Sequence, residues 1–251
     1  MHKLKTFITL ILVIILLCIN FFIFTENSDL LEPYLSEGTF SSNSYQPMVT
    51  INQTFGGPLL DYSYSVITAS DGGYILAGYT YSYGAGESDL WLVKTNSVGQ
   101  VEWNRTIGGL RGEFGFSIII SSDGGYIIVG GTESFGAGNY DLWLVKTNIT
   151  GQVEWNRTIG GPGAEYGFSI IESSEGGYIL AGRTDSYGVG GEDAWLLKTD
   201  ANGQVEWNHT FGGTGNDAAN SVIATTDGGY VFAGGTESNG DMDMWLVKTN
   251  G

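Results

Sequence analysis

The sequence predicts an all-β fold, a β-propeller of four blades with four antiparallel strands in each. Residues 49–251 repeat with a period of 52, and each unit holds four short runs rich in β-branched and aromatic residues, separated by glycine turns. The chain has 40 glycines in 251 residues, about twice the usual share, which fits many tight turns. Four strands in a unit of this length are typical of a propeller blade, whereas the alternative, a β-solenoid, usually has shorter rungs.

The N-terminal segment predicts export. Lys3 and Lys5 precede an apolar run over 7–24, and no acidic residue comes before Glu26. A helix of this run would span about 27 Å, close to the thickness of a bilayer core, which favours an uncleaved anchor over a cleaved signal peptide. We therefore predict a signal peptide or signal anchor over 1–25, a flexible polar stalk over 26–48 and the repeat domain over 49–251, outside the cell.

The second unit shows the expected strands most clearly, over 114–121, 126–132, 141–147 and 153–159. The sequence Ser122-Asp123-Gly124-Gly125 has the composition of a tight turn between the first two strands, and Asn148-Ile149-Thr150-Gly151 has that of a turn between the last two. Both pairs of strands are therefore predicted hairpins.

The two ends of the repeat predict ring closure. Residues 49–57 align with 101–109, so the repeat starts with an equivalent of the fourth strand of a unit. The last unit has its third strand at 245–248. We expect the N-terminal strand to pair there and complete the last blade, which would remove an exposed sheet edge. The alternatives are a piece of a larger array, or two copies in one eight-bladed ring.

Three recurring motifs resemble those of exported archaeal and bacterial β-propeller repeat proteins. In the second unit these are Asp123-Gly124-Gly125-Tyr126-Ile127, then Asp141-Leu142-Trp143-Leu144-Val145-Lys146, then Gly151 through Trp155. The resemblance covers 49–251. It implies a propeller fold and brings no catalytic motif, although family members usually have six to eight blades.

One face of the predicted propeller is the candidate binding face. It holds the connections between units and the connections from the second to the third strand, and the latter differ between units, at 81–88, 134–140, 186–192 and 238–242. Variable loops on a rigid scaffold are common binding sites. Some residues here break the fourfold pattern, as a specific ligand site requires. With Tyr79 beside them, the expected contacts with a carbohydrate or protein ligand are Tyr81, Tyr83, Arg111 and Arg183.

Two periodic sets of acids accompany this face. The first opens the innermost strand of each unit: Asp61, Glu113, Glu165 and Asp217. Four convergent carboxylates would suit a hard cation, so Ca²⁺ is the candidate cofactor, but the favoured interpretation is that each acid caps the amides of its own turn. The second set precedes the strand tryptophans and is also expected to accept hydrogen bonds from turns: Asp89, Asp141, Asp193 and Asp243.

The remaining periodic residues have structural interpretations. The tryptophans at 91, 143, 195 and 245 are expected in the core between blades. Lysines at 94, 146 and 198 are expected to pair with glutamates at 102, 154 and 206 across a hairpin. Five Asn-x-Thr sequons are candidate glycosylation sites: Asn52, Asn104, Asn148, Asn156 and Asn208.

Composition limits the function. A net charge of −17 with 10 Lys and Arg argues against nucleic-acid binding. Two histidines and one cysteine, Cys18, make Ser–His, Cys–His and zinc chemistry improbable. The sequence therefore predicts a non-catalytic binding or adhesion module, monomeric, secreted or anchored at the cell surface. The alternatives are a structural spacer and a carboxylate-based carbohydrate-active enzyme.

Overall fold

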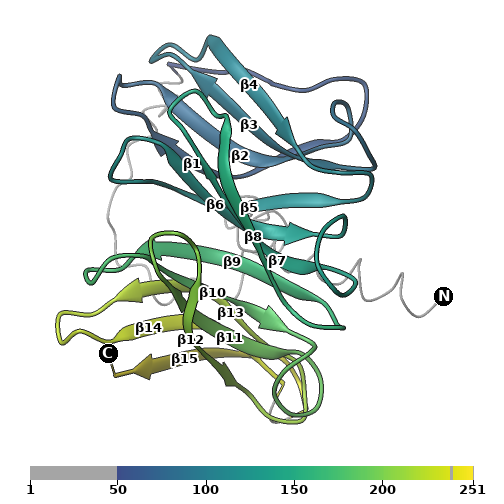
Figure 1. Cartoon of the computed structure of the whole chain (residues 1–251), viewed down its shortest axis with the longest axis vertical. Coiled ribbons are helices and arrows are strands. Elements are labelled where there is room, and N and C mark those ends of the chain that lie inside the picture. Colours follow the sequence, from purple (N-terminus) through teal and green to yellow (C-terminus); the bar gives the residue numbers. More distant parts are fainter. Residues whose placement is uncertain (1–49, 238–239, 251) are drawn as a thin grey trace, which may run out of the picture. The chain divides into compact units, whose positions relative to one another are not determined.

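The computed structural model describes residues 50–237 and 240–250 (Figure 1). The chain divides into the units 1–48 and 49–251, and the strands of the described residues belong to the second. The described residues contain no helix of the length and apolarity that a membrane crossing needs. The predicted signal segment over 1–25 and the stalk over 26–48 lie outside the described residues. The strands are β1 (Asp61–Thr68), β2 (Tyr74–Thr80), β3 (Asp89–Thr95), β4 (Val101–Ile107), β5 (Glu113–Ile120), β6 (Tyr126–Thr132), β7 (Asp141–Thr147), β8 (Val153–Ile159), β9 (Glu165–Glu172), β10 (Tyr178–Thr184), β11 (Asp193–Thr199), β12 (Val205–Phe211), β13 (Asp217–Ala224), β14 (Tyr230–Thr236) and β15 (Asp243–Thr249).

These strands form four separate antiparallel sheets in chain order. The first three sheets have four strands each, β1–β4, β5–β8 and β9–β12, and the fourth has the three strands β13–β15. We call them the first to fourth sheets. The all-β prediction is confirmed, and the second sheet matches the expected ranges to within one residue. A repeat in the sequence is thus a repeat of one meander sheet.

The turn from β5 to β6 shows why the Asp-Gly-Gly motif recurs. Gly124 has φ of 84°, a conformation open to glycine at little cost, and its N–H donates to the Ser121 carbonyl at 2.8 Å. Asp123 Oδ1 accepts a hydrogen bond from the Gly125 N–H at 2.9 Å. The motif therefore encodes the hairpin through one glycine conformation and one Asx hydrogen bond.

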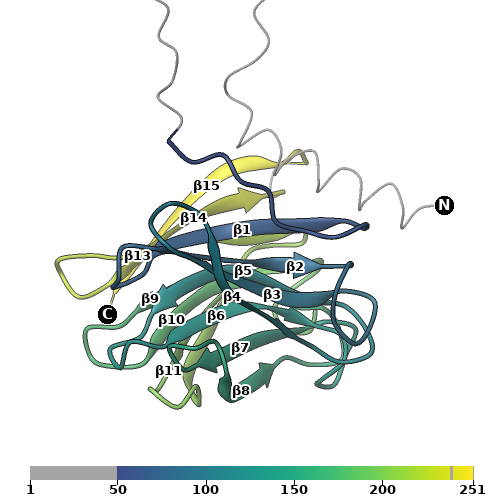
Figure 2. The ribbon, with the colours of Figure 1, turned by 90° about the horizontal axis from the view of Figure 1, so that it is seen from above.

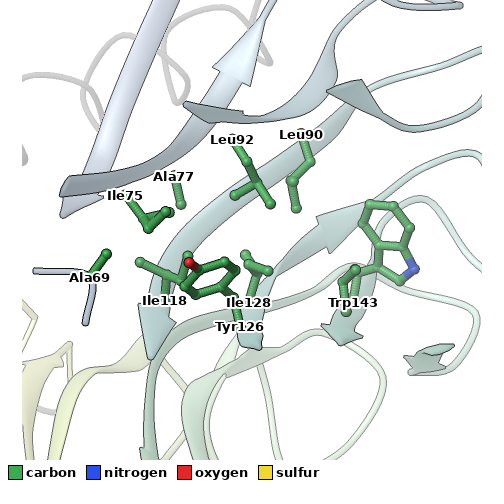
Figure 3. Close-up of a cluster of buried hydrophobic side chains, with 10 residues drawn as sticks. Ala69, Ile75, Ala77, Leu90, Leu92, Ile118, Tyr126, Ile128 and Trp143 are labelled. Carbon is green, nitrogen blue, oxygen red and sulfur yellow. The ribbon is translucent and has the colours of Figure 1, made fainter. Parts of the chain in front are cut away.

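Side chains from adjacent sheets make the core (Figure 3). Between the first and second sheets, Ile75, Ala77, Leu90 and Leu92 pack against buried residues from β5 to β7, and two similar clusters lie between the second and third and between the third and fourth sheets. Each sheet therefore has a forward face toward the next unit and a rear face toward the preceding unit. Both faces are apolar, so the middle sheets are buried on both sides.

The predicted closed ring of four blades is wrong. The sheets follow one another from the first, with β1, to the fourth, with β15, at the opposite end of the view in Figure 1. No sheet is closed, and within the described residues each core cluster joins two sheets that are consecutive in sequence, never the fourth to the first. Each sheet packs on its neighbour through equivalent residues, so the same displacement from one sheet to the next recurs. Three such displacements do not bring the fourth sheet back to the first.

The N-terminal strand prediction fails for the same reason. Residues 51–55 form no strand here, and β15 pairs with β14 alone among the described residues. Instead this segment lies against the first sheet: a Cβ on Gly99 would lie 2.6 Å from Cγ2 of Ile51. Strand β4 meets the second sheet in the same way, since a Cβ on Gly151 would lie 2.6 Å from the Trp103 ring. The segment thus holds the place of the outer strand of a preceding sheet.

Candidate functional site

A continuous group of aromatic rings crosses the first three sheets at their innermost strands. We call it the aromatic array. Most of its members come from the innermost strands β1, β5 and β9, and the rest come from β2 and the loops that follow β2 and β6. They are Tyr62, Tyr64, Tyr79, Tyr81, Phe114, Phe116, Tyr140, Tyr166 and Phe168.

A β-bulge places one ring on each of the innermost strands β1, β5 and β9. The pairing of β5 with β6 shifts register between Gly115 and Ser117, which leaves Phe116 without a partner position. Opposite the bulge stands Gly130, where a Cβ would lie 1.8 Å from the Phe114 carbonyl oxygen. A bulge re-aims the side chain at its centre. The glycine therefore makes room for the bulge, and Phe114 and Phe116, two positions apart, both face the array with their rings 5.9 Å apart.

Ring contacts link the sheets along the array. Tyr79 and Phe114 join the first and second sheets with centroids 4.9 Å apart and planes at 88°. Tyr140, in the loop after β6, then lies 5.2 Å from Tyr166 of β9. Tyr64 and Phe116 form a second link at 5.0 Å. Edge-to-face and offset geometries of this kind are favourable for aromatic pairs.

The array is partly exposed at the first sheet and does not continue into the fourth sheet. Tyr62, Tyr64 and Tyr81 are 48%, 39% and 39% exposed, which is unusual for large rings in contact with one another. In the fourth sheet the matching positions carry Ala218 and Asn220, so the array ends at the third sheet. The four units are therefore unequal at this surface, which gives it the asymmetry that a specific ligand site would need.

Arg183 closes the array at the third sheet. Its guanidinium lies 5.0 Å from the centre of the Tyr166 ring and 5.7 Å from that of Phe168. It also pairs with Glu192 at 2.7 Å, and the Arg183 side chain is only 14% exposed. Burial is the main cause that raises the pKa of the Glu192 carboxyl, and the charge of Arg183 opposes the rise. The arginine is therefore a fixed border of the site.

Three phenols of the array, those of Tyr79, Tyr140 and Tyr166, stay protonated at neutral pH. Burial raises the pKa of Tyr79, Tyr140 and Tyr166, and neighbouring phenols or carboxylates add to this rise. Glu133 lies next to Tyr140 and pairs with Arg111 at 3.1 Å. The surface therefore offers neutral ring faces and hydroxyl groups, with carboxylates at its border.

The structure brings part of the predicted ligand set together. Tyr79, Tyr81 and Arg183 lie in or against the array, with Tyr81 at 5.7 Å from Tyr79. Tyr83 packs on Trp91 instead and donates to the Gly56 carbonyl, while Arg111 contacts Glu133. The array also contains residues outside the predicted ligand set: Tyr62, Tyr64, Phe114, Phe116, Tyr140, Tyr166 and Phe168.

A pattern in the sequence marks most of these missed residues. In three units the acid that opens the innermost strand is followed by aromatic residues at the first and third positions, Tyr-x-Tyr, Phe-x-Phe and Tyr-x-Phe. In the fourth unit the same positions are Ala and Asn. Period-two spacing indicates that both rings of a pair lie on one face of the strand, and the change in the fourth unit is the asymmetry that a ligand site needs.

The first set of acids caps turns, as the favoured interpretation predicted. Glu113 accepts the N–H groups of Gly109 at 2.7 Å and Ser134 at 3.0 Å and the Thr132 hydroxyl at 3.0 Å. Glu165 repeats this arrangement in the third sheet, and Asp61 and Asp217 accept the equivalent glycine N–H. Each acid thus holds the connection between two units in place.

Three acids of the second set, Asp89, Asp141 and Asp193, also accept turn amides, and each lies beside an acid of the first set. Asp89 accepts the Ala85 N–H at 3.0 Å. A Cβ on Gly108 would lie 2.3 Å from Asp89 Oδ1 and 2.4 Å from Glu113 Oε2, so the two buried carboxylates border one glycine. Burial is the main cause that raises the pKa of the Asp89 carboxyl, and the charge of Glu113 adds to it. Among the described residues no group of three or more His, Cys, Asp and Glu could hold a metal ion. A Ca²⁺ ion at these acids stays a prediction.

The tryptophan and lysine predictions are confirmed. Trp91, Trp143 and Trp195 are buried, with Trp143 and Trp195 2% exposed. Trp245 is half-buried and packs against the cluster between the third and fourth sheets. Lysines pair with glutamates at 2.6 to 3.0 Å, and each also contacts the acid of the Asp-Gly-Gly or Glu-Gly-Gly turn. These pairs are Lys94 with Asp71 and Glu102, Lys146 with Asp123 and Glu154, and Lys198 with Glu175 and Glu206.

The sequon asparagines are placed at the surface, and three of them also serve the fold. Asn52, Asn104, Asn156 and Asn208 are exposed, and Asn148 is half-buried in a turn. Asn156 accepts a hydrogen bond from the Trp143 indole at 3.3 Å and Asn208 one from Trp195 at 3.1 Å. Asn148 Oδ1 accepts the Gln152 N–H at 3.0 Å. Glycosylation itself stays a prediction.

Comparison with known proteins gives no family for this chain, because no family model matches it. A curated protein, the regulatory protein FlaEY of Caulobacter vibrioides, is 26% identical over 198 residues, which are 69% of this chain and 20% of that protein. The chain therefore spans one fifth of that relative.

Two solved structures are also similar to the chain. A protein of unknown function from Bacteroides caccae has a TM-score of 0.41 at 12% identity over 75% of this chain and 60% of its own. A putative exo-β-1,3-galactanase from Bifidobacterium bifidum has a TM-score of 0.42 at 16% identity over 73% of this chain and 65% of its own. TM-scores this low establish no shared fold. The repeated antiparallel sheets of the chain itself identify it as a repeat β-domain.

Proposed function

We propose that this chain is a non-catalytic carbohydrate-binding module that acts outside the cell. The observation that carries the proposal is the aromatic array, a row of partly exposed rings that spans three sheets and is missing from the fourth. Exposed aromatic patches with a polar border commonly mark ligand surfaces. The apolar run within 1–25, preceded by Lys3 and Lys5, supports export of the domain.

The chemistry of the array favours an uncharged sugar chain. The rings of Tyr62, Tyr64 and Tyr81 present flat apolar surface, and their hydroxyl groups supply hydrogen bonds beside it. The border carboxylates of Glu133 and Glu192 can accept hydrogen bonds from sugar hydroxyls. A net charge of −17 disfavours anionic ligands. An extended neutral glycan meets all of these conditions.

The test is binding of the full chain to an array of neutral glycans, followed by titration calorimetry with the best ligand. We expect Tyr62→Ala to weaken binding about tenfold, since one lost stacking contact is worth about 1.4 kcal/mol. Phe135→Ala is the matched control, because Phe135 is 43% exposed but packs on Trp143 outside the array. Equal loss in both variants, or no bound glycan, would reject the proposal.

One measurement separates binding from catalysis. Glu192 has a raised pKa and lies beside the array, as a general acid of a carbohydrate-active enzyme would. Its ion pair with Arg183 and the second ion pair of Glu133 with Arg111 indicate structural carboxylates. We therefore expect no release of reducing sugar from a bound glycan during prolonged incubation. If the chain releases reducing sugar and Glu192→Gln abolishes the release, the chain is a carbohydrate-active enzyme and the binding-module proposal is rejected.

A further inference from the structure

The outer faces of the first and fourth sheets differ from those of every other sheet. On the forward face of the fourth sheet, Met244 and Leu246 are 95% and 71% exposed. Their equivalents one unit earlier, Ala194 and Leu196, are fully buried at 0% in the cluster between the third and fourth sheets. The forward face therefore carries the residues of a sheet interface, and no sheet within residues 50–237 and 240–250 covers it.

The rear face of the first sheet is also uncovered where the inner sheets are buried. Val66 is 61% exposed, whereas its equivalents Ile118, Ile170 and Val222 are each 3% exposed. A groove of about 350 Å³ lies on this face, bordered by Ile51, Phe55, Val66 and Leu76 among others. In the inner sheets the same place is filled by the forward face of the preceding sheet.

The segment 51–55 is placed as the outer strand of a sheet that the first sheet would follow. Gln53 lies close to Gly99, as Arg105 of β4 lies close to Gly151 and Arg157 of β8 lies close to Gly203. Within a sheet this outer strand pairs with the third strand: Arg105 is opposite Leu92 in the first sheet, and His209 is opposite Leu196 in the third. By the same register, Gln53 would stand opposite Leu246.

From these three observations we propose that the fourth sheet of one copy docks on the first sheet of a second copy, head to tail. Segment 51–55 of the second copy pairs with the outer edge of β15, and Met244 and Leu246 enter the groove beside Val66. The new contact uses positions equivalent to those of the three interfaces within the chain, in the same register. Its two surfaces are different patches, so the interface is heterologous. It also covers an apolar strand edge that would otherwise favour aggregation.

A second copy fits better than an unrelated protein because both halves of the interface are encoded in this sequence. The repeat supplies the forward face, the rear face and the strand that joins them, with equivalent residues at each position. This inference does not depend on the proposed glycan binding, because the array lies on the innermost strands and the docking residues lie on the sheet faces and the β15 edge.

Disulfide trapping between two variants tests the pairing directly. Two variants of the full chain are made, both with Cys18→Ser. One carries Gln53→Cys and the other carries Leu246→Cys, and each has a tag of a different size. The two variants are mixed in mild detergent and oxidised. We expect a mixed dimer on a non-reducing gel, in excess over like-with-like dimers. Arg105→Cys replaces Gln53→Cys in the matched control, because Arg105 has the same place in its unit but already pairs with Leu92. The control should give little mixed dimer.

Association in solution supplies a second readout. We expect Leu246→Lys to weaken self-association at least tenfold by analytical ultracentrifugation, since it puts a charge into an apolar contact. Ile149→Lys is the control, at a residue 56% exposed in a turn of the second sheet, and should leave association unchanged. Each of three results would overturn the proposal. The yield of mixed dimer could be no higher than in the Arg105→Cys control, or the chain could stay monomeric at all concentrations. A disulfide could also form within one chain that carries both cysteines.

Discussion

Arg183 donates a hydrogen bond from Nη1 to Oε2 of Glu192 at 2.7 Å while the same guanidinium stacks 5.0 Å from the Tyr166 ring centre. A residue that appears in the sequence only as a break in the fourfold pattern is thus held by an ion pair and an aromatic face at once. The two contacts fix the border of the aromatic array at the third sheet, and they make this arginine a test of the site.

Arg183→Met is expected to destabilise the domain by about 1–3 kcal/mol, because it leaves the half-buried Glu192 without its cation. Burial already raises the pKa of Glu192, and the substitution should raise it further. An acid with a raised folded pKa loses stability as pH rises through that value. Urea unfolding from pH 4 to pH 8 should therefore show the variant weakening relative to wild type as pH rises. A pH-independent difference would contradict the ion-pair account.

Lys146→Met is expected to cost about 1 kcal/mol, since its partners Asp123 and Glu154 are 56% and 44% exposed and can be hydrated. Burial lowers the pKa of Lys146, but the two carboxylates outweigh it and the net pKa is raised. The Asp123 pKa is lowered, mainly by its hydrogen bond with Lys146. The difference from wild type should persist from about pH 4 to about pH 10 and shrink as pH falls through the Asp123 pKa or rises through the Lys146 pKa.

Lys248→Met provides the control for this prediction. Lys248 holds the equivalent position in the fourth sheet and pairs with Asp227, but its side chain is 51% exposed. Removal of an exposed lysine from a surface pair should change stability less than removal of Lys146 in thermal melts at neutral pH. If the two variants melt alike, burial of the lysine does not determine its contribution.

Gly130→Ala is expected to destabilise the domain by more than 2 kcal/mol, because its Cβ would collide with the Phe114 carbonyl at 1.8 Å and force the bulge to shift. The same shift should move Phe114 and Phe116, so we also expect a changed near-ultraviolet circular dichroism signal. Gly124→Asn is the comparison, since Gly124 has φ of 84° with nothing within 4 Å of its Cβ and asparagine tolerates that conformation. It should cost less than 1 kcal/mol.

Glu113→Gln is expected to cost about 1–3 kcal/mol, because the amide places a donor against the N–H and hydroxyl donors that the carboxylate accepts. If capping is the whole role of these acids, 5 mM calcium or a chelator should leave the melting temperature of the wild-type domain unchanged. A rise with calcium that disappears in Glu113→Gln would instead place the predicted cation at this acid.

Local features of the fold were predictable because they depend on short-range sequence. Alternation in the strands and the Asp-Gly-Gly turns specify each hairpin, and the second sheet matches the predicted strands to within one residue. The capping role of Glu113 and the pairing of Lys146 with Glu154 also follow from neighbours within one hairpin or connection. The aromatic pairs were present in the sequence as well, but their common surface becomes evident only when three sheets lie next to one another.

The sequence by itself determined the repeating sheet, its turns and the two apolar faces through which sheets stack. Tertiary structure decided how those sheets are arranged, and it replaced the predicted four-blade ring with an open stack in which segment 51–55 lies against the first sheet. The reason is geometric: the step from sheet to sheet depends on how side chains such as Leu142 and Trp195 fill the space between them. Repetition of the sequence specifies that the same displacement from sheet to sheet recurs. The size of that displacement decides whether four sheets close into a ring.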